Sequence, residues 1–242
     1  MKKYFLALSS SRQVPLDKLG YKAKFAVLPD GGDENNIIIH EKGFMRLKIE
    51  ILSQEAHAAR PWLTQNPIEQ GTFFFNVIRQ EFPLPENEED WKTSVVFTLI
   101  NSGSWSNMNV IPKSAEIILD IRYLDKKEDQ EIIRKLNNIL AENQIEYKLE
   151  VVAQNNPLLV SKSNNYVIKL RREADKIIGK NPNFAKESAT SDAVFFTNHG
   201  IPAVLYRPQG GDAHTSREWV SQKSLFTFYK IIFNFLKNLK ER

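Results

Sequence analysis

Apolar and polar residues alternate from Gly43 to Gln54, which is the period of a strand with one buried face. The apolar members are Phe44, Leu47, Ile49 and Ile51. Further stretches rich in β-branched residues and bounded by turn residues are also predicted as strands. They run over residues 94–100, 115–122 and 146–153. This part of the chain therefore supplies several strands that can share one apolar core.

Two predicted helices interrupt these strands. The first begins with Asn66 as the N-cap, Pro67 at the first helical position and Glu69 closing a capping box. The second runs over residues 127–142 and carries an apolar stripe. Its members are Ile132, Leu136, Ile139 and Leu140. The order strand, helix, strand, strand, helix, strand predicts a ferredoxin-like α+β domain.

The residues on either side follow a different pattern. Short strands are predicted at 3–8 and 25–28, before the α+β domain. After it, helices and buried strands alternate up to a last helix that starts at Ser221, as in an α/β layer. We therefore predict an α/β layer with an inserted α+β domain. The predicted segments are 1–42 for the first part of the layer, 43–154 for the insert and 155–242 for the second part of the layer.

Composition narrows the classes of function. The 33 Lys and Arg residues and the 29 Asp and Glu residues are spread along the chain, which argues against a nucleic-acid-binding face. The chain contains no cysteine, so any metal must be held by His, Asp and Glu. No stretch is long and apolar enough to span a membrane, and the apolar run Tyr4–Leu8 is too short for a signal peptide. We expect a cytoplasmic protein that binds neither nucleic acid nor a membrane.

Two candidate residues lie in the first quarter of the chain, and each also has a purely structural interpretation. Asp30 follows a predicted strand, where α/β sheets bind their ligands, but it also fits a turn between Pro29 and Gly31. His57 lies among small residues just after a strand, where an ordinary surface histidine is equally consistent. These positions alone indicate no particular reaction.

Further candidates lie after residue 100. Asn109 precedes a turn, and Arg122 ends a strand two residues after Asp120. Side chains two apart on a strand share a face, so Asp120 and Arg122 either form a salt bridge or both meet a ligand. Asp192 fits a helix N-cap. His214 lies in a polar loop with the sequence GGDAHTSREW, where it is either solvated or a metal ligand and proton carrier.

The order of these motifs resembles that of a known family. The segment EKGFMRLKIEILSQEAHAARPWLTQNPIE matches three features of that family. These are a lysine-glycine strand, an Ala-His-Ala turn and an Asn-Ala-Ile helix start. Asn-Val-Ile-Pro and Asp-Ile-Arg segments are matched by GSWSNMNVIPKSAEIILDIR, and a Gly-Ile-Pro strand with a metal-histidine loop by SDAVFFTNHGIPAVLYRPQGGDAHTSREWV. With the PDGG turn, the chain from about Phe25 to Trp219 resembles the zinc-dependent amidohydrolases that include carboxypeptidase G, aminoacylase, acetylornithine deacetylase and succinyl-diaminopimelate desuccinylase.

The resemblance implies an incomplete phosphorylase/hydrolase-like catalytic layer with a ferredoxin-like lid that carries a homodimer interface. It implies hydrolysis of amide bonds in N-acyl amino acids or small peptides at two bridged zinc ions, which acidify a water whose proton a glutamate takes. Asp30 and His214 would be metal ligands, and His57 would polarise the scissile carbonyl in the partner's active site. Asn109 and Arg122 would orient the substrate, since a guanidinium suits a carboxylate.

One part of the family's pattern has no match in the chain. The His-x-Asp pair, the bridging aspartate and the Glu-Glu pair should precede Asp30, but residues 1–29 contain no histidine and a single acid, Asp17. A zinc site needs about three protein ligands, so Asp30 and His214 do not suffice for two ions. We therefore expect a truncated chain that is inactive alone, binds zinc weakly or not at all and exposes apolar surface on its α/β layer. It is a truncated reading frame, an engineered fragment or one half of a split enzyme, and in the last case a complementing N-terminal fragment is its partner. The alternative is a non-catalytic dimerisation or regulatory module.

Overall fold

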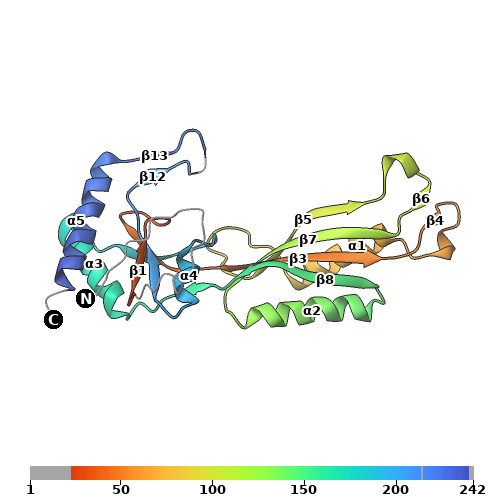
Figure 1. The fold of residues 1–242 in the computed structure, drawn as a ribbon, viewed down its shortest axis with the longest axis horizontal. Helices are drawn as coiled ribbons and strands as arrows, with labels where there is room; N and C mark the ends of the chain where they lie inside the picture. Colours follow the sequence, from red (N-terminus) through yellow and green to blue (C-terminus); the bar gives the residue numbers. More distant parts are fainter. Residues whose placement is uncertain (1–22, 214, 240–242) are drawn as a thin grey trace. The chain divides into compact units, whose positions relative to one another are not determined.

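The computed structural model describes residues 23–213 and 215–239. The chain forms two compact units, one made of Met1–Glu41 with Leu158–Arg242 and the other of Lys42–Pro157 (Figure 1). We call the first the layer unit and the second the lid unit; each has its own hydrophobic core. The strand predicted at 3–8 and the candidate ligand His214 lie outside the described residues. Within them, no helix is long and apolar enough to cross a membrane.

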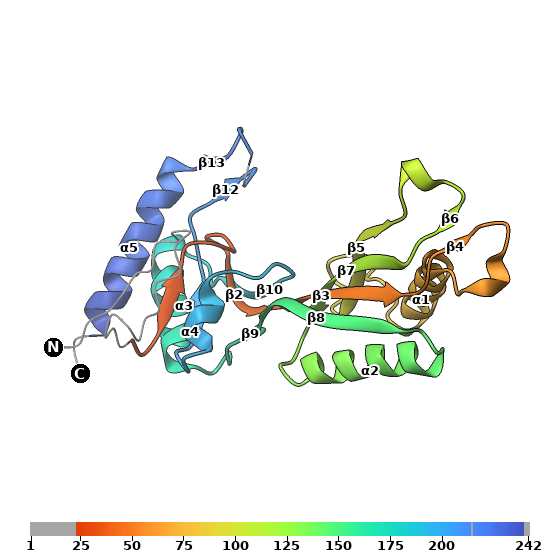
Figure 2. The same ribbon diagram turned by 45° about the vertical axis from the view of Figure 1, so that its right-hand side comes forward.

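The lid unit is a four-stranded antiparallel sheet with two helices packed on one face (Figure 2). Its elements are β3 (Gly43–Leu52), α1 (Pro67–Glu81), β5 (Ser94–Ser102), β7 (Ser114–Tyr123), α2 (Glu128–Glu142) and β8 (Tyr147–Asn155). The strands lie in the order β5-β7-β3-β8. This α+β arrangement is the ferredoxin-like fold that the order of elements predicts.

Alternation along the two central strands produces the two faces of this sheet. β3 and β7 pair over their whole length, from Gly43 opposite Tyr123 to Leu52 opposite Ser114. Every second residue of both strands is fully buried against the helices. On the other face, oppositely charged side chains of the two strands pair, Lys48 with Glu116 among them. One face is thus a core and the other is open and polar.

Helix α1 begins where the sequence predicts, with a modified cap. The Asn66 side chain accepts a hydrogen bond from the Ile68 N–H at 3.1 Å, and Pro67 occupies the first turn. The predicted capping box is wrong in its second half, because Glu69 accepts from the Asn66 side-chain amide at 3.2 Å and not from the backbone. Phe74 anchors the helix in the core with no exposed surface.

A small two-stranded ribbon lies beyond one end of the lid sheet (Figure 1). It consists of β4 (Ala56–His57) and β6 (Val110–Ile111), and each strand adjoins a 3₁₀ turn, Pro61–Leu63 after β4 and Trp105–Asn107 before β6. We call residues 55–65 and 103–113 together the lid tip. The sequence does not predict this ribbon, because a strand of two residues has no detectable period.

The layer unit contains a mixed sheet in the order β1-β11-β2-β10, with β9 also paired to β2. Its strands are β1 (Ala26–Leu28), β2 (Asn36–Glu41), β9 (Leu158–Leu159), β10 (Asn183–Glu187) and β11 (Ala203–Leu205), and a separate hairpin joins β12 (Gly210–Gly211) to β13 (Trp219–Val220). The helices are α3 (Asn165–Ile178), α4 (Ala193–Thr197) and α5 (Gln222–Asn238). β1 is parallel to β11 and β2 to β10, while β11 is antiparallel to β2. The sequence does not predict β2; in this region it predicts only the turn that precedes the strand.

Helix α5 is apolar on both sides. One side is buried in the core of the layer unit, through Phe228, Ile231, Ile232 and Phe235. The other side exposes Leu225, Phe226, Tyr229 and Phe233. Large apolar side chains gathered on one helix face are typical of a surface that another segment or chain covers.

Candidate functional site

The lid tip brings two of the candidate residues together. In the β4–β6 ribbon His57 lies opposite Val110, and the Ala58 N–H donates to the Asn109 carbonyl at 2.8 Å. The Asn109 side-chain nitrogen therefore lies 3.4 Å from His57 Nε2. Both side chains are exposed, so they form a pair that can meet a ligand arriving from outside the unit.

The backbone of the lid tip favours one tautomer of His57. The Ala59 N–H donates to His57 Nδ1 at 3.1 Å, so in the neutral imidazole Nδ1 carries the lone pair and Nε2 the proton. The Nε2–H and the Asn109 amide nitrogen are then two donors on the same side of the ribbon. Two neighbouring donors suit one acceptor oxygen, such as a carbonyl oxygen that gains negative charge during acyl transfer.

Large exposed apolar side chains lie in the turns that adjoin β4 and β6. Trp62 is 76% exposed in the turn after β4, and Trp105 is 91% exposed in the turn before β6. Leu63 and Met108, next to them in sequence, are exposed as well. Exposed tryptophans are rare on free surfaces and are enriched at interfaces. The lid tip therefore has the composition of a surface that another molecule covers.

Arg122 lies at the other end of the lid sheet. Its Nε donates to Asp120 Oδ1 at 2.7 Å and its Nη2 to Oδ2 at 3.4 Å, and Arg46 also donates to Asp120 at 3.3 Å. Arg122 lies eight positions along β7 from Ser114, which is about 26 Å at a rise of about 3.3 Å per residue. Within one lid, Arg122 is thus ion-paired and far from His57 and Asn109.

Acidic side chains gather at one edge of the layer unit's sheet. Glu41 ends β2 opposite Glu187, which ends the parallel strand β10, and the charge of Asp30 also reaches Glu41. Glu41 is only 1% exposed, and the Ser191 hydroxyl donates to it at 2.8 Å. Burial raises the pKa of Glu41 to about 7, with smaller increases from the charges of Glu187 and Asp30, although the Ser191 hydrogen bonds act in the opposite direction.

These acids do not amount to a metal site by themselves. Among residues 23–213 and 215–239, no group of three or more His, Cys, Asp or Glu side chains can hold a metal ion. Asp30 is exposed just after β1, and the second candidate ligand, His214, is not among the described residues. The part of the chain that the structure describes therefore does not fit a zinc ion without further ligands.

The structure changes the interpretation of Ser191-Asp192-Ala193, at the start of α4. It also adds two residues that the sequence analysis missed. The predicted N-cap, Asp192, makes no side-chain capping hydrogen bond; the Ala193 N–H donates instead to the Ser191 hydroxyl at 3.1 Å. Ser191 and Glu41 are the missed pair. The available signal was a glutamate two residues after the three isoleucines of NIIIHE, since a charge that ends a buried strand lies at the ligand edge of such a sheet.

Comparison with known proteins identifies the lid unit. Residues 39–148 match the family profile of the M20 peptidase dimerisation domain. The succinyl-diaminopimelate desuccinylase of Helicobacter pylori (strain Shi470) is 27% identical over 209 residues, which is 86% of this chain and 54% of that protein. The chain thus spans about half the length of the curated relatives that it matches.

Solved structures share the fold over most of the chain. Aminopeptidase PepT from Bacillus cereus ATCC 10987 superposes with a TM-score of 0.80 at 19% identity, over 93% of this chain and 60% of that one. The M20 family metallo-carboxypeptidase Sso-CP2 from Sulfolobus solfataricus superposes with a TM-score of 0.72 at 15% identity, over 92% of this chain and 65% of that one. The resemblance seen in the motifs is therefore confirmed: residues 39–148 match the M20 dimerisation domain, and most of the chain is similar to succinyl-diaminopimelate desuccinylases in sequence and to M20 metallopeptidases in fold.

Proposed function

We propose that the chain supplies the lid and part of the catalytic layer of a metal-dependent hydrolase that cleaves amide bonds in N-acyl amino acids or small peptides. The observation that carries the proposal is the pair of donors at the lid tip, His57 Nε2 and Asn109 Nδ2, 3.4 Å apart. A scissile carbonyl oxygen fits between such donors and is stabilised there as negative charge develops. The desuccinylase relatives, by their name, also cleave an acyl group from an amine.

His57 and Asn109 act, in this proposal, in the active site of a second copy of the chain. The support is the exposure of Trp62 and Trp105 in the two turns of the lid tip, since both side chains become buried when the lid tip docks on the partner. Arg122 serves a different active site of the same dimer, because about 26 Å of β7 separates it from Ser114, which directly follows the lid tip. There it exchanges Asp120 for a substrate carboxylate, which a guanidinium binds through two parallel hydrogen bonds.

The metals in this proposal are zinc, with Asp30 and His214 as two of the ligands. The other ligands come from a complementing N-terminal fragment, whose docking also covers the apolar side of α5. Without that fragment, the 242-residue chain is expected to bind little zinc and to hydrolyse nothing. We place the assembled enzyme in the cytoplasm.

A second candidate function is a non-catalytic dimerisation or regulatory module derived from such an enzyme. It is favoured by one observation, that the described residues contain no metal-holding group of their own. The two candidates differ in one respect that can be measured, since only the enzyme needs His57.

Co-expression with the N-terminal half of the Helicobacter pylori desuccinylase tests the proposal. The pair is expected to take up zinc and to hydrolyse N-succinyl or N-acetyl amino acids, whereas the chain alone does neither. His57→Ala should lower kcat of the pair about 10²- to 10³-fold, as expected for the loss of an oxyanion donor, with an unchanged metal content.

His199→Ala is the matched control, because His199 is an exposed histidine of the layer unit whose ring donates to the Phe195 carbonyl at 2.7 Å. Its activity should equal that of the unchanged pair. Equal activity of His57→Ala would exclude the catalytic role of the lid tip. If the co-expressed chains form a dimer but bind no zinc and are inactive, the regulatory module is favoured. Tight zinc binding with turnover by the chain alone would refute the need for a complementing fragment.

A further inference from the structure

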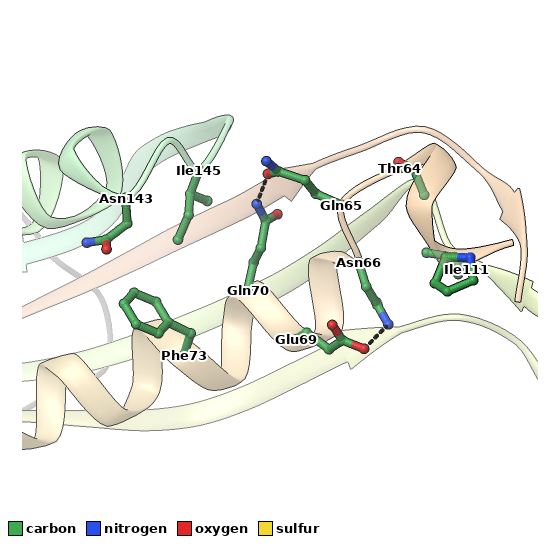
Figure 3. Close-up of a pocket in the computed structure, with 10 residues that line it drawn as sticks. Thr64, Gln65, Asn66, Glu69, Gln70, Phe73, Ile111, Asn143 and Ile145 are labelled. Atoms are coloured by element: carbon green, nitrogen blue, oxygen red, sulfur yellow. Dashed lines mark hydrogen bonds between the residues drawn. The ribbon is translucent and has the colours of Figure 1, made fainter.

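The lid unit contains a cavity that is separate from the lid-tip pair. It has a volume of about 460 Å³ and lies between the start of α1 and the turn after α2 (Figure 3). Gln70 and Phe73 of α1 line it on one side, and Asn143 and Ile145 line it on the other. The segment Thr64–Asn66, which leads from the lid tip into α1, completes the wall.

One buried hydrogen-bond acceptor in this cavity lacks a partner. The Gln70 amide nitrogen donates to the Gln65 side-chain oxygen, as the dashed line in Figure 3 shows. The Gln70 side-chain oxygen is buried and accepts no hydrogen bond from any described residue. An unpaired buried acceptor is unfavourable, so a ligand that brings a donor to this oxygen gains free energy.

The charge around the cavity favours a cation. Among the described residues that line it, Glu69 is the only charged one. Asn143 is the C-cap of α2, and the last carbonyls of a helix carry partial negative charge. The opposite partial charge at the start of α1 is reduced, because Asn66 caps the first turn and Glu69 lies in it. An anion would meet the Glu69 carboxylate without a compensating cation in the lining.

The remaining wall is apolar. Phe73 is 45% exposed although it lies beside the cavity, and Ile145 is buried opposite it. In Figure 3 Phe73 and Ile145 face each other at the left end of the group of labelled side chains, and Glu69 with Asn66 lies farther to the right. The Phe73 and Ile145 side chains both suit contact with an aliphatic chain, whose burial against them is favourable.

We propose that this cavity binds the primary alkylammonium group of a small molecule. The ammonium donates to Gln70 Oε1 and to the Glu69 carboxylate, and its aliphatic chain packs between Phe73 and Ile145. The site uses neither His57 nor Asn109. It therefore stands whether or not the lid tip takes part in hydrolysis, and its test needs no activity.

The proposal is tested by titrating the full chain with n-pentylamine at neutral pH and measuring binding by calorimetry and by NMR. We expect saturable binding with a Kd of about 1 mM or below, which suits a ligand of this size. n-Pentanol and pentanoate, with the same chain length, should bind at least about tenfold more weakly, because a hydrogen bond to a charged group is stronger than one between neutral groups.

Two variants and a control assign the binding to the cavity. Gln70→Met keeps the size of the side chain without the acceptor, and Glu69→Gln removes the charge. Each should weaken n-pentylamine binding about tenfold or more with unchanged thermal unfolding. Gln80→Met, at an exposed position of the same helix, should leave it unchanged. Equal binding of pentanol and pentylamine, no saturable binding, or binding unaffected by both cavity variants would overturn the proposal.

Discussion

Replacing Glu41 with glutamine is expected to stabilise the layer unit by about 3 kcal/mol at pH 8 and to leave its stability nearly unchanged at pH 4. Burial raises the pKa of Glu41 from 4.5 to about 7 in the folded chain. Between these two values the folded state therefore binds more protons than the unfolded state. The contribution of Glu41 to stability is present below pH 4.5 and is lost as the pH rises through 7. Glutamine cannot ionise, so it avoids this loss and keeps a side chain of the same size.

Amide hydrogen exchange in β2 and β11 measures this effect, because it reports the opening of the layer unit separately from the lid unit. The free energy of opening should fall between pH 5 and pH 8 in the unchanged chain and stay level in Glu41→Gln. Glu142→Gln, at an exposed position of the lid, is the control and should follow the unchanged chain. Parallel pH profiles for Glu41→Gln and the unchanged chain would show that Glu41 does not titrate in this range.

The lid unit follows closely from its sequence because strong local signals agree there. Alternation marks β3 and β7, and the Asn-Pro pair at 66–67 marks the start of α1. β2 escapes prediction because its isoleucines directly follow a turn of Gly, Asp, Glu and Asn, and its pairing partner β10 lies more than a hundred residues later. A strand identified mainly by distant pairing has a weak local pattern.

The candidate site shows the same limit. Sequence motifs select His57, Asn109 and Arg122 separately, but they carry no information on which residues meet. The pairing of β4 with β6 brings His57 next to Asn109. The length of β7 keeps Arg122 away from both of them within one lid. The raised pKa of Glu41 could not be derived from sequence either, because it depends on burial by segments far apart in the chain.

Placing a lysine at Ile100 is expected to weaken self-association of the chain by about 100-fold or more, because it puts a charge into an apolar edge. β5 is an edge strand of the lid sheet, and its nine residues, Ser94–Ser102, contain no charged side chain. Ile100 is 56% exposed, and Ile68 and Phe75 of the adjoining helix α1 are also exposed. The opposite edge, β8, carries Lys148 and Glu150, which discourage pairing between edges. We therefore propose that two copies associate through β5 and the exposed side of α1.

Sedimentation over a range of micromolar concentrations measures the change. The unchanged chain should be a dimer, and Ile100→Lys should be a monomer that unfolds at nearly the same temperature, because residue 100 is already largely exposed in one copy. Val152→Lys on β8, where the side chain is 54% exposed, is the matched control and should remain dimeric. A dimer that survives Ile100→Lys but dissociates on Val152→Lys would place the interface on β8. An unchanged chain that is monomeric throughout would exclude self-association through either edge, and with it the action of His57 in a second copy.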